Sequence, residues 1–381
     1  MLPTQAKIPN VGNMHTIKNL ITKIQYSLFP ELEEHFEEKL SPNDEAFIKA
    51  IELIRPDRFL GQFEYLGRGQ PPKSRLSLFL AFLAKSIYGI ATTTLLIDYL
   101  NSNKLLRNLC GYEYRSQIPS ESTFSRAFAQ FSEVQLLERI HQQVIKENLS
   151  EELVFHISRD STSIEVREKP APKKETPASE QTPKRKRGRP RKTDPKVEPE
   201  KTRLERQKDR SLEENLKDLP EAQCEKGTKK NASGYKHSWN GYKLHLDVID
   251  GDIPISAILT GAAIHDSQLA IPLAQMSHSK VTSLYDLMDA AYDAAPIKEV
   301  VEGLGRVPII DPNPRSGPKV QLPNDRLERF KNRSSVERVN GNLKDNFGGR
   351  SIRVKGATKV MCHLMFGLIA LTAAGLYRAF T

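Results

Sequence analysis

Residues 330–344 read FKNRSSVERVNGNLK, and this stretch says most about how the chain folds. Arg333, Glu337 and Lys344 stand four and seven residues apart, which places them within roughly 40° of one another on a helix. An apolar stripe lies beside them, made of Val336, Val339 and Leu343. The segment therefore predicts a helix that packs on a core and presents one carboxylate between two cations. A salt-bridged surface helix has the same pattern, so the segment alone leaves both interpretations open.

The spacing from Phe330 to Lys344 resembles the Tyr-x2-Arg-x3-Glu-x6-Lys signature around the last acid of one large group of bacterial insertion-sequence DDE transposases. Phe330 stands where the group has Tyr, so the phenol hydroxyl is missing, whereas the acid and both cations are present. The resemblance implies an α/β fold of the ribonuclease-H-like type, with a mixed sheet and flanking helices. It also implies two upstream aspartates at the ends of β-strands.

Both aspartates have candidates. Residues 153–160 read LVFHISRD, an apolar run ending in Asp160 that is similar to the first strand of that fold. Residues 281–293 end in DAAYD, similar to the DAGYD that follows the family's second acidic strand, and this selects Asp289. Asp286 is the local alternative, but an offset of three residues puts it on the other face of an extended strand.

The segment between these two aspartates, residues 240–265, reads NGYKLHLDVIDGDIPISAILTGAAIH and predicts a hairpin turning at Asp250-Gly251-Asp252. The family has such a hairpin, followed by a Gly-x-x-x-His-Asp turn that matches Gly261 to Asp266. A single aspartate is more often a turn or cap residue than a ligand. The order strand, hairpin, strand and helix carries the resemblance, which covers residues 154–376 apart from an insert.

By this resemblance, Asp160, Asp289 and Glu337 are the catalytic residues and the ligands of two Mg²⁺ ions, with Mn²⁺ as a substitute. Two such ions about 4 Å apart can activate a nucleophile and stabilise the leaving oxygen during phosphodiester cleavage, and Mg²⁺ prefers carboxylate oxygens. Without metal, three acids drawn together repel one another and their pKa values rise. Arg333 and Lys344 are expected to bind DNA, one as a planar fork and the other as a point charge.

The net charge of +10 is unevenly distributed, because residues 167–230 hold 21 Lys or Arg against 13 Asp or Glu, a net of +8. This stretch is also rich in Pro and nearly free of aromatic residues. It cannot bury enough apolar surface to offset its conformational entropy. We therefore expect a mostly disordered basic insert in the catalytic domain, with marginal helix at 201–219.

Within the insert, residues 184–192 read KRKRGRPRK and resemble an AT-hook. Pro keeps such a backbone extended, and arginines on either side enter the narrow minor groove of A-tracts. The candidate groove-binding residues are Arg187, Arg189 and Arg191. A polybasic linker that binds any phosphate backbone and a nuclear-localisation-like run are the alternatives.

Residues 1–150 are predicted to form an all-α domain that binds DNA or dimerises, and residues 151–381 the catalytic domain. Its helical segments, such as 71–101 and the one that begins after Ser120, resemble the all-α domain that commonly precedes this catalytic domain. Helix-turn-helix recognition, with Lys104 and Arg126 as phosphate contacts, and a simple packing bundle both remain open.

Three cysteines, Cys110, Cys224 and Cys362, stand far apart in no CxxC pattern, which fits a reducing cytosol and excludes a zinc finger. No basic and apolar signal peptide opens the chain. The apolar run at 363–377 is too short to span a bilayer, so we expect a buried terminal helix and no membrane contact. The expected location is cytoplasmic, in association with the nucleoid.

The sequence thus predicts a DNA transposase of an insertion sequence, active as a homodimer or larger assembly. Its DNA partners would be the terminal inverted repeats, which it would cut at their 3′ ends, and the target DNA to which it joins them. One alternative is a catalytically silent, transposase-derived AT-hook DNA-binding protein. Another is a structure-specific nuclease on the same fold, which strand-joining assays would separate.

Overall fold

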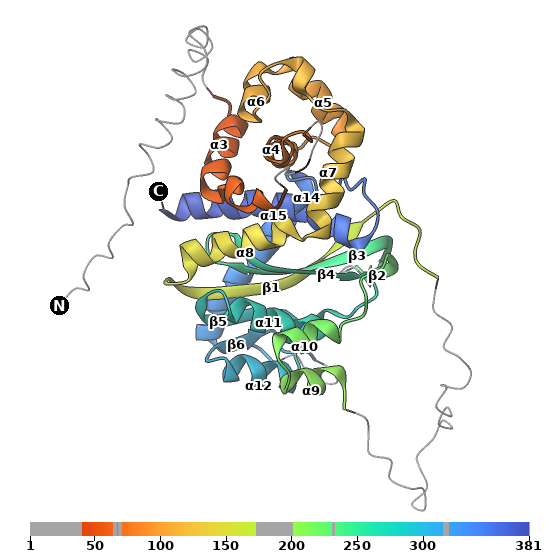
Figure 1. The fold of residues 1–381 in the computed structure, drawn as a ribbon. Helices are drawn as coiled ribbons and strands as arrows, with labels where there is room; N and C mark the ends of the chain where they lie inside the picture. Colours follow the sequence, from red (N-terminus) through yellow and green to blue (C-terminus); the bar gives the residue numbers. More distant parts are fainter. Residues whose placement is uncertain are drawn as a thin grey trace, which may run out of the picture.

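The structure is a computed structural model that describes residues 40–63, 67, 71–172, 201–230, 233–314 and 320–380. Within these residues, a six-stranded mixed sheet lies between two layers of helices, and a further group of helices sits at one end (Figure 1). This arrangement is consistent with the ribonuclease-H-like fold that the sequence resemblance implies.

The sheet is built around β1, which pairs antiparallel with β3 on one side and parallel with β5 on the other. Strand β6 pairs parallel with β5, while β2 and β4 pair antiparallel with successive halves of β3. The strands are β1 (Leu153–Glu165), β2 (Glu225–Lys230), β3 (Lys236–Ile249), β4 (Ile253–Gly261), β5 (Thr282–Met288) and β6 (Val307–Ile310).

The predicted hairpin is confirmed as β3 and β4, which turn at residues 250–252. Gly251 and Asp252 both have positive φ angles, +81° and +61°. A tight turn that joins twisted strands needs such angles, and glycine adopts them without steric cost.

One face of the sheet is covered by α11 (Ala270–His278) and α12 (Ala295–Gly303), with α9 (Arg203–Lys208) and α10 (Leu212–Lys217) packed outside them. The other face is covered by α8 (Leu136–Leu149), α14 (Ser334–Asp345) and α15 (Ala357–Phe380). Short elements join these layers: α13 (Asn324–Phe330) and the 3-10 turns η7 (Asp266–Leu269), η8 (Ala290–Tyr292) and η9 (Lys331–Arg333).

The described residues from 40 to 149 form helices and no strand. Polar caps begin several of them: the Ser41 and Thr92 hydroxyls accept hydrogen bonds from backbone amides of the first turn. Helix α4, in which most side chains are buried, runs through the middle of the group, as Figure 1 shows end-on. The elements are α3 (Pro42–Ile54), η3 (Pro56–Phe59), η4 (Gly61–Phe63), α4 (Arg75–Ile87), α5 (Thr93–Ser102), α6 (Lys104–Leu109), η5 (Arg115–Gln117), α7 (Glu121–Glu133) and α8.

The C-terminal helix α15 joins the two parts of the chain. It packs on β4 and α14 and also on α3, α4, α7 and α8, so one hydrophobic core continues across the predicted domain boundary at residue 150. Its 24 residues are long and apolar enough to cross a membrane, so the expectation of a run too short to span was wrong. The helix extends beyond the apolar run at both ends. Because 78% of its most apolar window is buried inside the protein, α15 is a core helix.

The helix expected at 201–219 is confirmed as α9 and α10, whereas the expectation of disorder was wrong for residues 225–230, which form β2. Capping boxes begin both helices, Thr202 with Glu205 and Ser211 with Glu214. Both helices then pack on α11 or α12, and β2 extends the sheet at β3. Residues 173–200, and with them the AT-hook candidates Arg187, Arg189 and Arg191, lie outside the described residues.

Candidate functional site

Asp160 lies on β1, directly after the last residue of this strand that pairs with β5. The parallel pairing with β5 ends at Arg159 opposite Met288, whereas the antiparallel pairing with β3 continues to Glu165. The expectation that the strand ends at Asp160 was therefore wrong. The polar residues after Asp160 remain in the strand because β3 supplies backbone partners for them.

Asp289 follows the last residue of β5 and caps η8, where its Oδ1 accepts a hydrogen bond from the Ala291 amide at 2.9 Å. Since Arg159 stands opposite Met288 in a parallel pair, the next residues, Asp160 and Asp289, come to the same level of the sheet. The register of two strands thus brings together acids that are far apart in the chain.

Glu337 enters the site from the first turn of α14. The predicted apolar stripe of this helix is confirmed, because Val336, Val339 and Leu343 are buried in the core, and α14 packs on β1 and β3. This packing sets the height and the rotation of the helix, and therefore the position of the Glu337 carboxylate.

The Arg333 guanidinium stands between the three acids. Its Nη1 donates to Glu337 Oε1 at 2.6 Å, and its Nη2 lies 3.5 Å from Asp160 Oδ1 and 3.7 Å from Asp289 Oδ2. Side-chain exposure rises from 18% at Asp160 to 40% at Asp289 and 59% at Glu337. The acid on β1 is thus mostly buried, whereas the acid on α14 is exposed to solvent. Three acids against one arginine give the site an excess of negative charge.

Burial raises the pKa of Asp160 to about 6, and the neighbouring Asp289 carboxylate adds to that rise, while Arg333 and Lys229 oppose it. The cause is thus mainly the loss of solvent, rather than the repulsion between acids expected from the sequence. Burial also disfavours the charge on Arg333, but Asp160, Asp289 and Glu337 outweigh it, so the pKa of the guanidinium is raised. The acids thus favour the charged form of Arg333, and Arg333 favours the charged form of Asp160.

Three carboxylates are the donors that a divalent cation such as Mg²⁺ prefers, so the site fits such an ion in donor type. With the side chains as they stand, no group of three His, Cys, Asp or Glu among the described residues is spaced to hold an ion. The positive charge between the acids is that of Arg333. A metal ion and this guanidinium would therefore compete for the same oxygens.

Lys344 lies farther along α14 and does not contact the acids. Its Nζ donates to Ser163 Oγ at 3.3 Å, three residues beyond Asp160 on β1. Burial and the charges of Arg350 and Lys229 lower the pKa of this ammonium. Sequence reasoning missed Lys229, an exposed residue of β2 whose charge acts on both Asp160 and Lys344. No local signal marked it, because the pairing of β2 with β3 brings it there.

A second charged cluster lies on the opposite face of the same strands. Arg159 binds Asp247 through two bonds of 2.8 Å and contacts Asp286 at 3.2 Å, and Arg306 binds Asp286 at 2.8 Å. All four side chains are almost completely buried. The expectation that Asp286 faces away from the site is therefore confirmed. The signal for this cluster was a charged residue within each of three strands, Arg159 on β1, Asp247 on β3 and Asp286 on β5.

Two more residues of the predicted motifs lie near the acids. Asp266 binds the Lys243 ammonium at 2.9 Å; burial opposes its charge, but Lys243 and His245 outweigh it, and its pKa is lowered. Tyr292, from the DAAYD motif, is fully buried, and burial together with the charges of Asp266, Asp160 and Asp289 raises the pKa of its phenol. His265 instead caps η7 and contacts Ser267.

Two family models match the chain. The model of a transposase DDE domain matches residues 156–373, more than half of the chain, and includes all three acids. The model of a transposase domain (DUF772) matches residues 33–130, a range that includes most of the described helical part. No curated protein and no solved structure matches the chain significantly.

Proposed function

Because this chain belongs to the family of transposases with a DDE domain, we propose that it binds the terminal inverted repeats of an insertion sequence and cleaves their 3′ ends by hydrolysis. It then joins these ends to target DNA by transesterification. The convergence of Asp160, Asp289 and Glu337 on one guanidinium, from three separate elements, is the observation that supports this reaction most strongly.

The proposed cofactor is a pair of Mg²⁺ ions, which Mn²⁺ can replace, held by Asp160, Asp289 and Glu337. When bound, such ions supply an activated water or 3′-hydroxyl at neutral pH and stabilise the leaving oxygen. The burial of Asp160 lowers the local dielectric and strengthens its attraction for a cation. Glu337, the most exposed acid, is the one that substrate can reach most easily.

The chain's own cations position the DNA. Once the acids are neutralised by metal, the planar Arg333 fork is free to bind a phosphate near the bond to be cut. Lys344, which donates to Ser163 and forms no ion pair with any other described residue, would hold a second phosphate of the same strand. Arg187, Arg189 and Arg191 would add contacts in the minor groove of AT-rich DNA.

The helical part is proposed to recognise the ends of the element, and two or more copies would assemble on DNA in the cytoplasm, at the nucleoid. A catalytically silent DNA-binding protein gains no support from the site, because all three acids and Arg333 are present and converge. A nuclease without joining activity differs from a transposase only in the second step. Strand-joining products are therefore the decisive readout between these two enzymes.

The test uses DNA that flanks the coding region and carries its imperfect inverted repeats. The wild-type protein should nick the 3′ ends in Mg²⁺ and join them to a plasmid. Asp160→Asn, Asp289→Asn and Glu337→Gln should each lower cleavage by at least about a hundredfold, since loss of even an outer-shell partner of a metal site can cost that much. Binding to the ends should stay within about threefold, a change of less than 1 kcal/mol. If Asp289→Asn cleaves DNA as fast as the wild type, the assignment of Asp289 as a catalytic metal ligand is wrong.

A further inference from the structure

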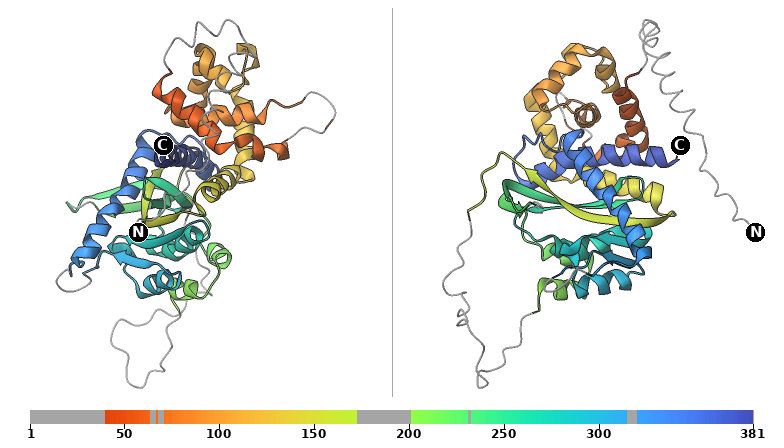
Figure 2. Two further views of the ribbon diagram at one scale, coloured as in Figure 1. Left: turned by 90° about the vertical axis from the view of Figure 1, so that its left-hand side faces the viewer. Right: turned by 180° about the vertical axis from the view of Figure 1, so that it is seen from behind.

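A cleft of about 460 Å³ lies between the helical part and the segment that joins α14 to α15. Its walls come from the C-terminal end of α4, the start of α5, α7, residues 347–359 and α15. It begins beyond the C-terminal end of α14, roughly 14 Å along the helix from Glu337 at 1.5 Å per residue. Figure 2 shows α14 crossing the sheet toward the helical part. The cleft is therefore distinct from the acidic site.

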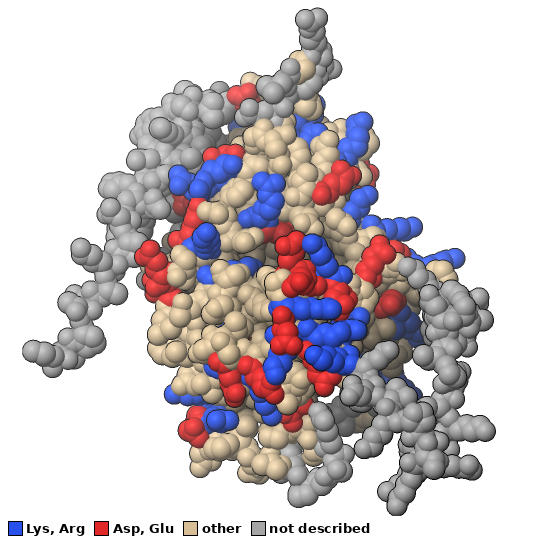
Figure 3. Space-filling view, turned by 60° about the horizontal axis from the view of Figure 1, so that its bottom comes forward, with Lys and Arg blue, Asp and Glu red and all other residues tan. Residues whose placement is uncertain are grey.

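Four cations line this cleft, with one acid, Glu121. They are Lys85, Arg353, Lys355 and Lys359. Among the described residues, none of these cations has a carboxylate partner within ion-pair distance. On the face formed by α9, α10 and α12, by contrast, acidic and basic side chains are interspersed (Figure 3) and pair, as Lys298 does with Asp293 at 2.6 Å. The cleft thus concentrates positive charge that no described carboxylate neutralises through an ion pair.

Lys85 is partly buried, so its positive charge is unfavourable in this cleft unless an anion binds there. Burial lowers the pKa of its ammonium to about 8, with the charge of Arg353 acting in the same direction. Hydroxyl groups that can donate hydrogen bonds line the same cleft, on Thr92, Thr93, Thr94, Ser125 and Ser351. Helix α5 begins at this wall and directs the positive end of its dipole there. Cations, hydroxyls and a helix N-terminus together suit phosphate oxygens.

Further cations connect the cleft with the acids. Arg333, which directly precedes α14, and Lys344 near its end stand eleven residues apart. At the rise of a helix this is roughly 16 Å, or about five base-pair steps of duplex DNA. The charge of Arg350 reaches Lys344, and Arg353 follows at the cleft. A duplex with its scissile phosphate at the acids can thus extend along α14 toward the cleft.

We propose that this cleft, lined by Lys85, Arg353, Lys355 and Lys359, binds the phosphodiester backbone of the DNA end several base pairs from the cleaved bond. The inference rests on the proposed function, since it takes DNA to be the substrate. Because the contact is to phosphate, it contributes affinity and orientation and no base specificity.

The test measures binding of a fluorescent duplex over a series of salt concentrations. The variant Arg353→Ala/Lys355→Ala/Lys359→Ala removes three exposed cations with little risk to the fold. It should lower the slope of log affinity against log salt by about two to three, and affinity at moderate salt by at least about tenfold. Lys85→Met, which keeps the side-chain length, should lower the slope by about one.

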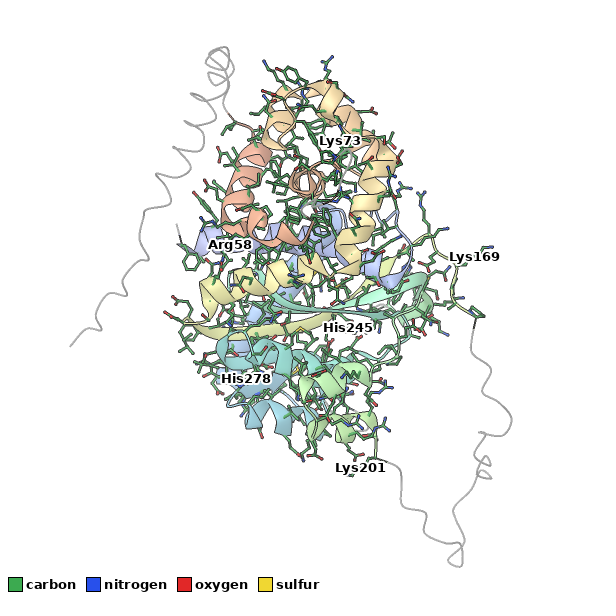
Figure 4. The ribbon with its side chains drawn as sticks, in the orientation of Figure 1. Arg58, Lys73, Lys169, Lys201, His245 and His278 are labelled. Atoms are coloured by element: carbon green, nitrogen blue, oxygen red, sulfur yellow. The ribbon has the colours of Figure 1, made fainter. Side chains whose placement is uncertain are left out.

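The matched control, Lys146→Ala/Lys201→Ala/Lys217→Ala, removes the same charge from exposed positions outside the cleft. Figure 4 marks Lys201 at the far end of the molecule from α4. Its slope and affinity should stay near those of the wild type. Equal losses in both triple variants, or none in the cleft variant, would overturn the proposal while the proposed function stands. If the cleft variant loses binding of inorganic phosphate but keeps its DNA affinity, the cleft is a small-anion site. If the wild type binds no DNA, the proposed function itself fails.

Discussion

Two charged clusters lie on opposite faces of the sheet, and neighbouring residues of β1, Arg159 and Asp160, belong to one each. The cluster of Arg159 has two arginines and two aspartates, is almost fully buried, and is closed by bonds of 2.8–3.2 Å. The cluster of Asp160 has three acids around one arginine and opens to solvent. Equal numbers of opposite charges need no outside partner, whereas excess acid at an open surface attracts a cation.

The comparison also distinguishes a cluster that stabilises the fold, that of Arg159, from one that is suited to a reaction, that of Asp160. We call them the closed cluster and the open cluster. In the closed cluster, every charge is matched, so its geometry can hold β1, β3 and β5 in register. In the open cluster, Arg333 compensates the acids only in part, and its contacts to Asp160 and Asp289 are long, at 3.5 and 3.7 Å. Such contacts can be exchanged for a stronger cation without loss of the fold.

The largest effect is expected from a substitution that breaks the closed cluster. Asp247→Ala leaves the Arg159 guanidinium buried with only one acid, so the free energy of unfolding should fall by about 3–5 kcal/mol. Urea denaturation measures this loss. The control is Glu299→Ala, which breaks an exposed pair with Lys208 and should cost less than about 1 kcal/mol. Equal stability of the two variants would show that the closed cluster does not hold the sheet.

The next effect tests the competition between Arg333 and metal. Arg333→Gln leaves three acids without a cation, so stability without metal should fall by about 1 kcal/mol, an allowance for the exposed acids. Mg²⁺ should then raise the melting temperature by a few degrees more in this variant than in the wild type. Thermal unfolding of Arg333→Gln and of the wild type, with and without Mg²⁺, measures this difference.

Arg338→Gln is the matched control on the same helix, because Arg338 pairs with Asp252 away from the acids. Mg²⁺ should stabilise it no more than the wild type. If Mg²⁺ affects Arg333→Gln and Arg338→Gln alike, the guanidinium of Arg333 does not occupy the cation position.

A smaller effect is expected when an acid of the open cluster is neutralised. Asp289→Asn keeps the shape of the side chain and reduces the excess of negative charge, so the free energy of unfolding should stay within about 1 kcal/mol of the wild type. Urea denaturation of this variant beside Asp247→Ala gives the contrast directly. A loss as large as that of Asp247→Ala would mean that both clusters are structural.

The smallest effect concerns Lys344, which lies between the acids and the basic cleft. Lys344→Ala should lower the salt slope of DNA binding by about one. Metal binding should not change, because an ammonium group has no lone pair to offer. An unaltered slope would show that Lys344 serves only the contact with Ser163.

Much of the fold could be predicted because its signals are local. The turn at residues 250–252 and the apolar stripe of α14 follow from short spacings, and both are present as predicted. For residues 201–230 the composition indicated only marginal helix at 201–219, and no signal predicted strand β2. There, capping boxes and packing on α11 and α12 order segments that could not fold alone.

The sequence by itself determined the helix that carries Glu337, since residue spacing sets which side chains share a helix face, and its resemblance to the DDE family selected Asp160 and Asp289 as the other two acids. Only the tertiary structure decided the role of Arg333 between the acids, the approach of Lys229 and the uncompensated cations of the cleft. These depend on strand register and on packing between segments distant in the chain. Charge interactions act through space, so no local pattern of residues records them.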